Sequence, residues 1–372
     1  MSGRKKIVLL GATGSIGENT LSVVREHPDR FELLGIASNR DGQGLSAIAD
    51  EFKVPHRALF SESGLEGLIE MATLPEAEVV IVATTGTVGV RPTLAALEAG
   101  KTVGLANKET LVLAGQFVMP VARQSAGRLL PVDSEHNAIF QCLEGLRGPE
   151  QLQRILLTAS GGPFLHHTRK ELEFVKKEDA LRHPNWEMGT KVTIDSATMA
   201  NKGLEMIEAR WLFDLKPSQI EVVIHPQSII HSMAEFIDGS VIAQMAPPSM
   251  TFPIQHVLAW PDKVTPAAPT LDFSRIHRLE LRPPDLEKFP ALRLARESLE
   301  AGGLSPAVYN AANEVAVQAF LEGKIAFTGI PRLIENCLQA SSFSNPGSLE
   351  ELLALEPQLL EFSLGQLNKL TA

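Results

Sequence analysis

Short apolar runs alternate with amphipathic stretches over the first part of the chain. The runs predict β-strands at residues 6–11, 32–38, 78–85, 101–106 and 128–133. The stretches between them have helical periodicity and predict helices at 15–27, 44–53, 90–100 and 115–127. Because such strands are apolar on both faces and helices separate them, the pattern predicts a Rossmann-like, doubly wound parallel sheet.

The pattern changes near residue 150. Further runs predict strands of a mixed sheet at 151–160, 221–236 and 239–246, and Thr168 and Glu171 form a capping-box pattern at a helix start. Residues 261–290 contain six prolines and read as a connector. Later periodic stretches predict helices at 291–302, 305–323, 329–340 and 348–370.

These patterns predict an α/β protein in several parts. We expect an N-terminal parallel-sheet domain, a central α+β domain with a mixed sheet, and a C-terminal helical domain. The predicted boundaries are 1–132, 133–260, the proline-rich connector 261–290, and 291–372.

Composition narrows the class of protein. The 372 residues are 44% hydrophobic and 21% charged, so the chain can bury a full core. A net charge of −10 without a basic block argues against a nucleic-acid or anionic-membrane surface, and no segment reaches membrane-spanning length. Cys142 and Cys337 both lie in apolar helical patterns, which fits the reducing cytoplasm rather than a disulfide framework.

A glycine-rich turn follows the first predicted strand. Gly11, Gly14 and Gly17 lie between that strand and the next helix, where glycines let a pyrophosphate approach the backbone at the helix N-terminus. The spacing differs from the usual dinucleotide pattern, so its position in a parallel sheet carries the interpretation. An ordinary glycine-rich turn remains the alternative.

The end of the second predicted strand bears on cofactor choice. It carries Ser38, Asn39 and Arg40 where an NAD site usually has an acid. The Arg40 guanidinium suits the 2′-phosphate of NADPH, although the acidic Asp41 follows it directly. Alternatively, Arg40 is only a solvated charge in a loop.

Three carboxylates are candidate metal ligands. If Asp133 ends a strand, Asp133 and Glu135 point the same way at its carboxyl edge; alternatively, Asp133 or Ser134 caps a helix. In the later helix, Asn201, Lys202 and Glu205 share a face distinct from the apolar stripe, although a surface Lys–Glu pair is also common. The predicted apolar stripe of that helix is Leu204, Ile207, Trp211 and Leu212. Three hard oxygen ligands without His or Cys select Mg²⁺ or Mn²⁺.

Several long motifs resemble one enzyme family. "GATGSIG", "LANKETLV", "PVDSEHNAIFQCL", "LTASGGPF", "HPNWEMGTKVTIDSATMANKGLE" and "HPQSIIHSM" follow in the order found in 1-deoxy-D-xylulose 5-phosphate reductoisomerases. The resemblance implies an NADPH-dependent oxidoreductase of non-mevalonate isoprenoid biosynthesis. Such an enzyme isomerises 1-deoxy-D-xylulose 5-phosphate and reduces the product to 2-C-methyl-D-erythritol 4-phosphate with a divalent metal. It also implies a homodimer.

The resemblance implies a role for particular residues. The metal ligands would be Asp133, Glu135 and Glu205. The substrate would contact Lys108, Ser134, Glu135, Ser160, His183, Ser196, Asn201, Lys202 and Glu205. NADPH would contact Thr13, Gly14, Ser15, Ile16, Asn39, Arg40, Asn107, Glu109 and Gly189. His231, Ser228 and Met250 would lie around the site.

The catalytic roles would fall to Lys202, Lys108, Glu135, His183 and Trp186. The lysines can stabilise charge or move protons. Residues 182–192 would form a lid whose Trp186 covers the substrate, whereas the residues alone favour a packed loop anchored by its Trp. His183 could cap a loop, and Ser196 could be a helix N-cap.

Two other classes of protein stay open on the residues alone. An NAD(P)-dependent dehydrogenase without a catalytic metal shares the glycine-rich turn, and activity that survives EDTA would favour it. A regulator that senses NADPH without turnover predicts no phosphate pocket and tolerance of Glu205→Gln. The dehydrogenase alternative gives no reason for Asp133, Glu135 and Glu205 to converge.

Overall fold

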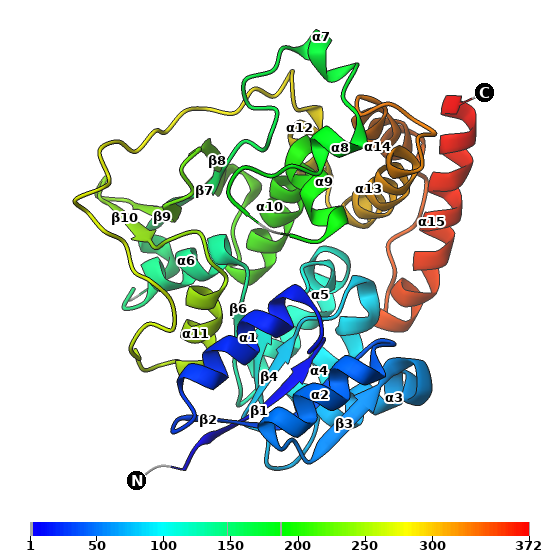
Figure 1. Cartoon of the computed structure of the whole chain (residues 1–372). Coiled ribbons are helices and arrows are strands. Elements are labelled where there is room, and N and C mark those ends of the chain that lie inside the picture. Colours follow the sequence, from blue (N-terminus) through cyan, green and yellow to red (C-terminus); the bar gives the residue numbers. More distant parts are fainter. Residues whose placement is uncertain (1–2, 147, 187, 372) are drawn as a thin grey trace. The chain divides into compact units, whose positions relative to one another are not determined.

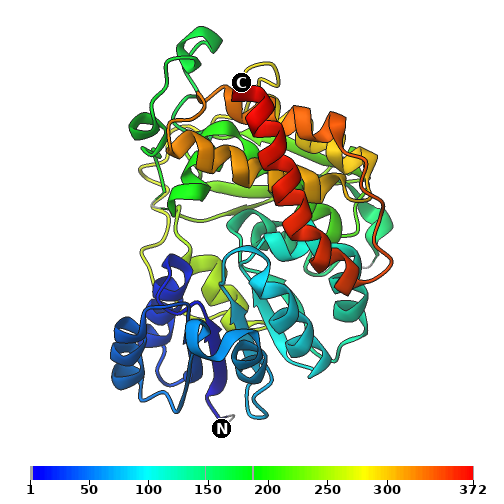
Figure 2. The same cartoon turned by 90° about the vertical axis from the view of Figure 1, so that its right-hand side faces the viewer.

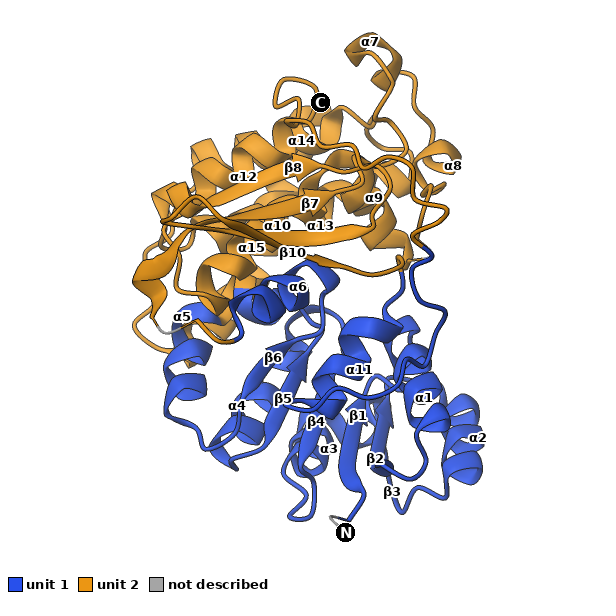
Figure 3. Ribbon diagram, turned by 90° about the vertical axis from the view of Figure 1, so that its left-hand side faces the viewer, with its two compact units in different colours: residues 1–111, 115–144, 249–272 blue, residues 112–114, 145–248, 273–372 orange. Residues whose placement is uncertain are grey.

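The computed structural model describes residues 3–146, 148–186 and 188–371. The chain divides into two compact units (Figure 3). Unit 1 comprises residues 1–111, 115–144 and 249–272, and unit 2 comprises residues 112–114, 145–248 and 273–372. The predicted functional domains, with boundaries at 132, 260 and 290, remain predictions.

A six-stranded parallel sheet forms the centre of unit 1 (Figure 1), which confirms the predicted fold class. Its strands are β1 (Lys5–Leu10), β2 (Phe31–Ser38), β3 (His56–Leu59), β4 (Val79–Val82), β5 (Thr102–Leu105) and β6 (Leu129–Pro131). They lie in the order β3-β2-β1-β4-β5-β6, and each neighbouring pair is parallel. The strand order reverses beside β1, where folds of this type bind dinucleotides.

Helices pack against both faces of this sheet. They are α1 (Ser15–Glu26), α2 (Gly42–Phe52), α3 (Phe60–Ala72), α4 (Val90–Glu98), α5 (Glu109–Gln124), α6 (Ser134–Leu143) and α11 (Thr251–Ala259). One buried cluster joins Ile7 and Leu9 of β1 to Leu21 of α1, Ile48 of α2 and Ile254 of α11. Neighbouring residues of a strand point to opposite faces, which is why these strands are apolar throughout.

The sequence pattern missed β3 and α3. Strand β3 has only four residues, and His56 and Arg57 are exposed at the sheet edge, so it lacks the apolar run expected of a central strand. Gly64 interrupts α3 with a φ of +62°, which weakens its helical periodicity. Helix α5 begins at Glu109, earlier than predicted.

A buried histidine makes the stability of unit 1 dependent on pH. The pKa of His256 is lowered to about 4, chiefly by burial and also by the Lys263 charge, while Glu144 opposes the shift. The unfolded chain binds more protons as pH falls from about 6.5 to about 4, so the free energy of unfolding falls over this window. When the pH is lowered from about 7 to about 5, we expect the free energy of unfolding of the wild type to fall by about 2 kcal/mol more than that of His256→Gln. Urea unfolding of both proteins checks this, and equal losses would contradict it.

Unit 2 is built on a four-stranded mixed sheet, as predicted. Its strands are β7 (Leu152–Ala159), β8 (Ile220–Ile224), β9 (Ile230–Phe236) and β10 (Val241–Met245), in the order β10-β9-β7-β8. Strands β7 and β8 are parallel, whereas β9 is antiparallel to β7 and to β10. Helix α10 (Ala200–Leu212) packs on β7 and β8 and follows α9 (Thr190–Thr198) directly.

Two short helices lie between β7 and α9, and four longer helices end the chain. The short ones are α7 (Arg169–Leu172), which has the predicted Thr168–Glu171 capping box, and α8 (Lys177–Ala180). The longer ones are α12 (Pro290–Ala301), α13 (Ser305–Leu321), α14 (Gly329–Ala340) and α15 (Leu349–Thr371), close to the predicted positions. Figure 2 shows the red α15 crossing the orange helices, and α15 packs on α13 and α14.

None of the helices among the described residues is both long and apolar enough to cross a bilayer.

Candidate active site

The predicted cofactor residues of unit 1 follow the carboxyl ends of its parallel strands. Gly11 leaves β1 with a φ of +97°, and a Cβ there would lie 2.4 Å from the carbonyl oxygen of Ala83. A Cβ on Gly17 would lie 2.3 Å from the carbonyl oxygen of Ala12. Both glycines are therefore required by the backbone. Gly14 precedes α1 without a side-chain cap, so Thr13, Ser15 and Ile16 surround a helix N-terminus suited to phosphate.

The end of β2 places Asn39 and Arg40 on the surface, and both are exposed. The acidic neighbour Asp41 is committed elsewhere, because its side chain accepts a 2.8 Å hydrogen bond from the Gly44 N–H and caps α2. Asp41 is thus the N-cap of a helix rather than the acid that contacts a ribose 2′-hydroxyl.

Asn107 ties two strand ends of unit 1 together. Its side-chain amide donates 2.7 Å hydrogen bonds to the carbonyl oxygens of Thr84 and Gly86, and its oxygen accepts from Thr110. Because these bonds occupy both ends of the amide, Asn107 holds the loops after β4 and β5 in place. Glu109, also predicted to contact the cofactor, begins α5.

Asp133 is the N-cap of α6, so the helix-cap alternative is correct and the strand-based reason for pairing it with Glu135 is wrong. Its carboxylate accepts a hydrogen bond from the Glu135 N–H, and its other oxygen lies 2.9 Å from Lys108 Nζ. Burial by itself raises the pKa of the Asp133 carboxyl, but the Lys108 charge and His136 outweigh it and hold that pKa well below its usual range. Ser134 donates a 2.6 Å hydrogen bond to Glu135.

Unit 2 carries the remaining predicted acid on α10. Lys202 and Glu205 are 4% and 1% exposed and form an ion pair, so the surface-pair alternative is wrong. Asn201 donates a 2.5 Å hydrogen bond to the other Glu205 oxygen. The predicted apolar stripe was also wrong in part, because Trp211 and Leu212 are only partly buried while this polar face is buried. A buried carboxylate whose two oxygens both accept hydrogen bonds has a fixed orientation.

A second polar group of unit 2 follows β7. His183 Nδ1 accepts hydrogen bonds from the Asn185 and Trp186 N–H groups, so its Nε2 carries the proton and donates to Ser160 Oγ at 3.1 Å. The loop-cap alternative for His183 is therefore correct, and it also fixes the proton on the nitrogen that faces Ser160.

The glycines after Ser160 bring this group against α9. Gly162 has a φ of +66°, and a Cβ there would lie 2.8 Å from the carbonyl oxygen of Ser196. Ser196 lies inside α9 and is not its N-cap, which contradicts that alternative. Gly162 thus brings the turn after Ser160 against the backbone of α9 at Ser196, an approach that only glycine permits.

The predicted lid residues pack on unit 2. The Trp186 and His231 rings lie 6.2 Å apart, edge to face, and His231 Nε2 donates to the carbonyl oxygen of Ala246. Ser228, at a φ of +53°, accepts a 3.0 Å hydrogen bond from Asn185. Gly189 precedes α9 without a side-chain cap. Residue 187 of the predicted lid lies outside the described residues.

Met250 packs against the hydrophobic core of unit 1.

The sequence analysis did not single out three polar residues that lie beside the predicted metal and substrate residues. His136 lies 3.8 Å from Asp133 and is fully buried, Asn185 of the predicted lid donates a hydrogen bond to Ser228, and Asp195 is buried beside Ser196. His136 could have been found from its position three residues after Asp133 on one helix. Asn185 and Asp195 carry no comparable signal.

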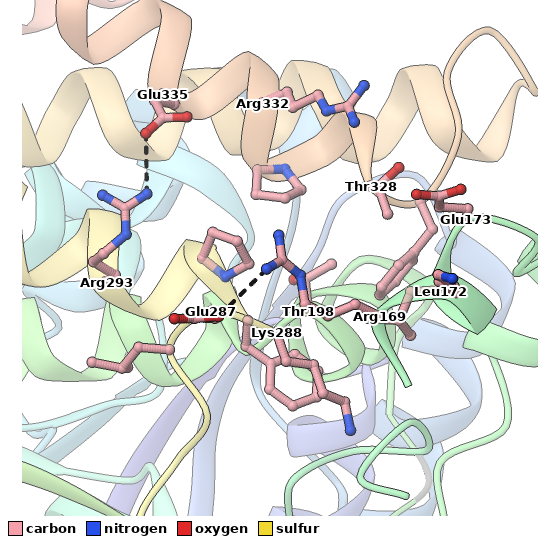
Figure 4. Close-up of a pocket in the computed structure, with 16 residues that line it drawn as sticks. Arg169, Leu172, Glu173, Thr198, Glu287, Lys288, Arg293, Thr328, Arg332 and Glu335 are labelled. Atoms are coloured by element: carbon pink, nitrogen blue, oxygen red, sulfur yellow. Dashed lines mark hydrogen bonds and ion pairs between the residues drawn. The ribbon is translucent and has the colours of Figure 1, made fainter. Parts of the chain in front are cut away.

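A separate cavity of about 690 Å³ opens in unit 2 between α7, α12 and α14 (Figure 4). Arg169 and Glu287, and Arg293 and Glu335, form ion pairs across it. Arg169 and Glu287 are mostly exposed, so water screens their pair. None of the predicted substrate or cofactor residues lines this cavity.

Comparisons with known proteins agree with this arrangement. The model of the 1-deoxy-D-xylulose 5-phosphate reductoisomerase family matches residues 7–63 and 56–115. Models of its C-terminal domains match residues 129–213 and 245–361.

Curated relatives match nearly the whole chain. The reductoisomerase of Chlorobium chlorochromatii is 49% identical over 370 residues, which cover 95% of this chain and 97% of the relative. That of Chlorobaculum tepidum is also 49% identical and covers 94% and 96%.

Solved structures of the family have the same fold. The Zymomonas mobilis enzyme in complex with NADPH has a TM-score of 0.91 and 40% identity, covering 98% of this chain and 99% of that one. A structure with NADPH, fosmidomycin and magnesium has a TM-score of 0.92 and 38% identity over the same shares. With near-complete coverage at this identity, the chain belongs to the 1-deoxy-D-xylulose 5-phosphate reductoisomerase family.

Proposed function

We propose that this protein isomerises 1-deoxy-D-xylulose 5-phosphate and reduces the product with NADPH to 2-C-methyl-D-erythritol 4-phosphate, in non-mevalonate isoprenoid biosynthesis. The observation that carries the proposal is 49% identity to curated enzymes of this activity over almost the full chain. NADPH oxidation in the presence of this substrate tests it directly. Oxidation should require added Mg²⁺ or Mn²⁺ and stop with EDTA; oxidation that survives EDTA would contradict it.

Asp133, Glu135 and Glu205 would hold the divalent metal. Their donor chemistry supports this, because three carboxylates suit a hard cation. Two of these carboxylates have a lysine beside them within their own unit. Lys108 pairs with Asp133, and Lys202 pairs with Glu205. The bound cation supplies charge stabilisation to the oxygens of the substrate.

The substrate phosphate would lie at the group formed by Ser160, His183 and Ser196. Each offers a donor, and His183 carries its proton on Nε2, the nitrogen that faces Ser160. Asn201, Ser134 and Glu135 would contact the sugar. Lys202 and Lys108 would stabilise charge on its oxygens or move protons.

Trp186 would cover the bound substrate and exclude water. Its packing against His231 supports this, because an edge-to-face contact fixes a large apolar surface on unit 2. Replacing Trp186 with Ala should raise the KM for the sugar phosphate, and an unchanged KM would remove it from this role.

NADPH would be held by Thr13, Gly14, Ser15 and Ile16 at the N-terminus of α1, with Asn39 and Arg40 near its 2′-phosphate. Arg40 is exposed and Asp41 is turned away to cap α2, which leaves a cation without a competing acid at this strand end. Asn107, Glu109 and Gly189 would complete the cofactor site.

We expect Arg40→Ala to reduce the preference for NADPH over NADH by about tenfold, since a hydrogen bond to a charged group contributes about 1.5–3 kcal/mol. The ratio of kcat/KM for the two cofactors measures it. Arg57→Ala, an exposed arginine on β3, is the matched control. An unchanged ratio would remove Arg40 from this role.

The enzyme would act as a homodimer in the cytoplasm. Strand β10 is an edge of the unit 2 sheet, with Val241 and Ile242 about half exposed, a surface that a second chain could cover. Cys142 and Cys337 are both buried thiols, which fits a reducing compartment. Light scattering that gives the mass of one chain, or recovery from a secreted fraction, would contradict these two points.

A further inference from the structure

Helix α13 contacts both helices that carry predicted substrate residues. Tyr309 and Asn313 lie four residues apart on one face of α13, and both are fully buried. Asn313 faces α9, which carries Ser196, and Tyr309 faces α10, which carries Asn201 and Lys202.

The contact with α9 is a charged hydrogen bond. The Asn313 amide donates to Asp195 Oδ1 at 2.7 Å, and Lys191 donates to Oδ2 at 2.8 Å. Asp195 is 1% exposed, so water contributes little to its solvation and these donors stabilise its charge. Asp195 is the residue directly before Ser196, so the position of its carboxylate fixes this turn of α9.

The contact with α10 is close packing. A Cβ on Gly203 would lie 2.8 Å from the Tyr309 hydroxyl oxygen and 2.6 Å from Ala295 Cβ of α12. The Tyr309 hydroxyl donates to the carbonyl oxygen of Ala291, also on α12. Gly203 follows Lys202 directly, so the same face of α13 limits where α10 can lie.

Only Met199 separates the two substrate helices. It has a φ of +65°, ending α9 and starting α10. A single strained residue fixes their connection, and the angle between them depends on contacts such as those made by α13.

We propose that Asn313 is a positioning residue for the reaction: through Asp195 it sets the place of Ser196 relative to Asn201 and Lys202. The C-terminal helices would then act on the substrate site without touching the substrate. This inference rests on the proposed substrate contacts of Ser196 and Asn201.

Asn313→Asp replaces the donor by a carboxylate of the same shape and repels Asp195. The KM for the sugar phosphate should rise about 10-fold to 100-fold, the usual cost of losing a hydrogen bond to a charged group. The KM for NADPH should stay within about twofold, because the predicted NADPH phosphate contacts lie on unit 1. The reversed pair, Asp195→Asn with Asn313→Asp, restores one amide and one carboxylate and should recover most of the loss.

Val317→Ala, a buried change on the same helix, is the control for lost stability. It should lower the melting temperature and leave both KM values unchanged. A normal KM for the sugar phosphate in Asn313→Asp, or no recovery in the reversed pair, would overturn the inference. If Asn313→Asp does not fold, Asp195→Asn alone should raise this KM severalfold, and an unchanged value would likewise overturn it.

Ser196→Ala separates this inference from the proposed function. If Ser196→Ala raises the KM for the sugar phosphate and Asn313→Asp does not, only the positioning role fails. If Ser196→Ala itself has no effect, the assigned substrate contact is wrong, and the positioning role of Asn313 falls with it.

Discussion

Glu205→Gln is expected to lower kcat by about 1000-fold or more while NADPH binding persists, because an amide cannot replace a charged metal ligand. The change keeps the shape of the side chain and leaves the hydrogen bond from Asn201 possible. The cofactor residues after β1 and β2 belong to unit 1, whereas Glu205 belongs to unit 2. Steady-state kinetics and NADPH fluorescence titration measure the two effects separately.

Glu235→Gln is the control for Glu205→Gln. Glu235 is a partly buried carboxylate of β9, also in unit 2, that pairs with Arg154, so its loss tests a paired carboxylate that is not among the proposed ligands. It should retain far more activity than Glu205→Gln. Equal losses in the two variants, or loss of NADPH affinity in Glu205→Gln, would contradict the separate metal and cofactor roles.

Lys202→Met should abolish turnover and also destabilise the protein. Removing one partner of a buried ion pair leaves an uncompensated charge, which costs about 3 kcal/mol or more. Lys202 and Glu205 are 4% and 1% exposed, so little water can replace the lost ammonium group. Urea unfolding in the absence of metal measures the stability, and NADPH oxidation measures the turnover.

The double variant Lys202→Met with Glu205→Gln separates these effects. Removing both charges leaves no unpaired ion, so stability should return toward the wild-type value. Activity should not return, since the double variant lacks both the proposed ligand and the proposed charge-stabilising group. Recovery of turnover would show that neither residue has its assigned role.

The parallel sheet of unit 1 could be predicted because its central strands are apolar on both faces. Strands β1, β2, β4 and β5 are buried and separated by helices with clear periodicity. The edge strand β3 was not predicted, because half of its residues are exposed. The C-terminal helices were predicted closely, since α12 and α14 are amphipathic. Gly302 also marks the end of α12, and Gly329 marks the start of α14.

The site was predicted through motifs, and its detailed geometry was not. Asp133 and Glu135 were paired by a strand argument, whereas Glu135 lies in the first turn of α6. The buried face of α10 could not be read from periodicity, because Lys202 and Glu205 are polar residues buried as an ion pair.

Contacts distant in the sequence were also beyond prediction. Asp195 and Asn313 are 118 residues apart, and neither is unusual in its own helix. Only the folded chain brings such pairs together.

The most direct test of the account is the binding of Mn²⁺ to the wild type and to Asp133→Asn, Glu135→Gln and Glu205→Gln, followed by electron paramagnetic resonance. One tight site per chain is expected, weakened about 100-fold or more by each single change, as the loss of any one carboxylate ligand should do. Undiminished Mn²⁺ affinity in Glu205→Gln, with loss in Asp133→Asn, would contradict a single ion held by Asp133, Glu135 and Glu205.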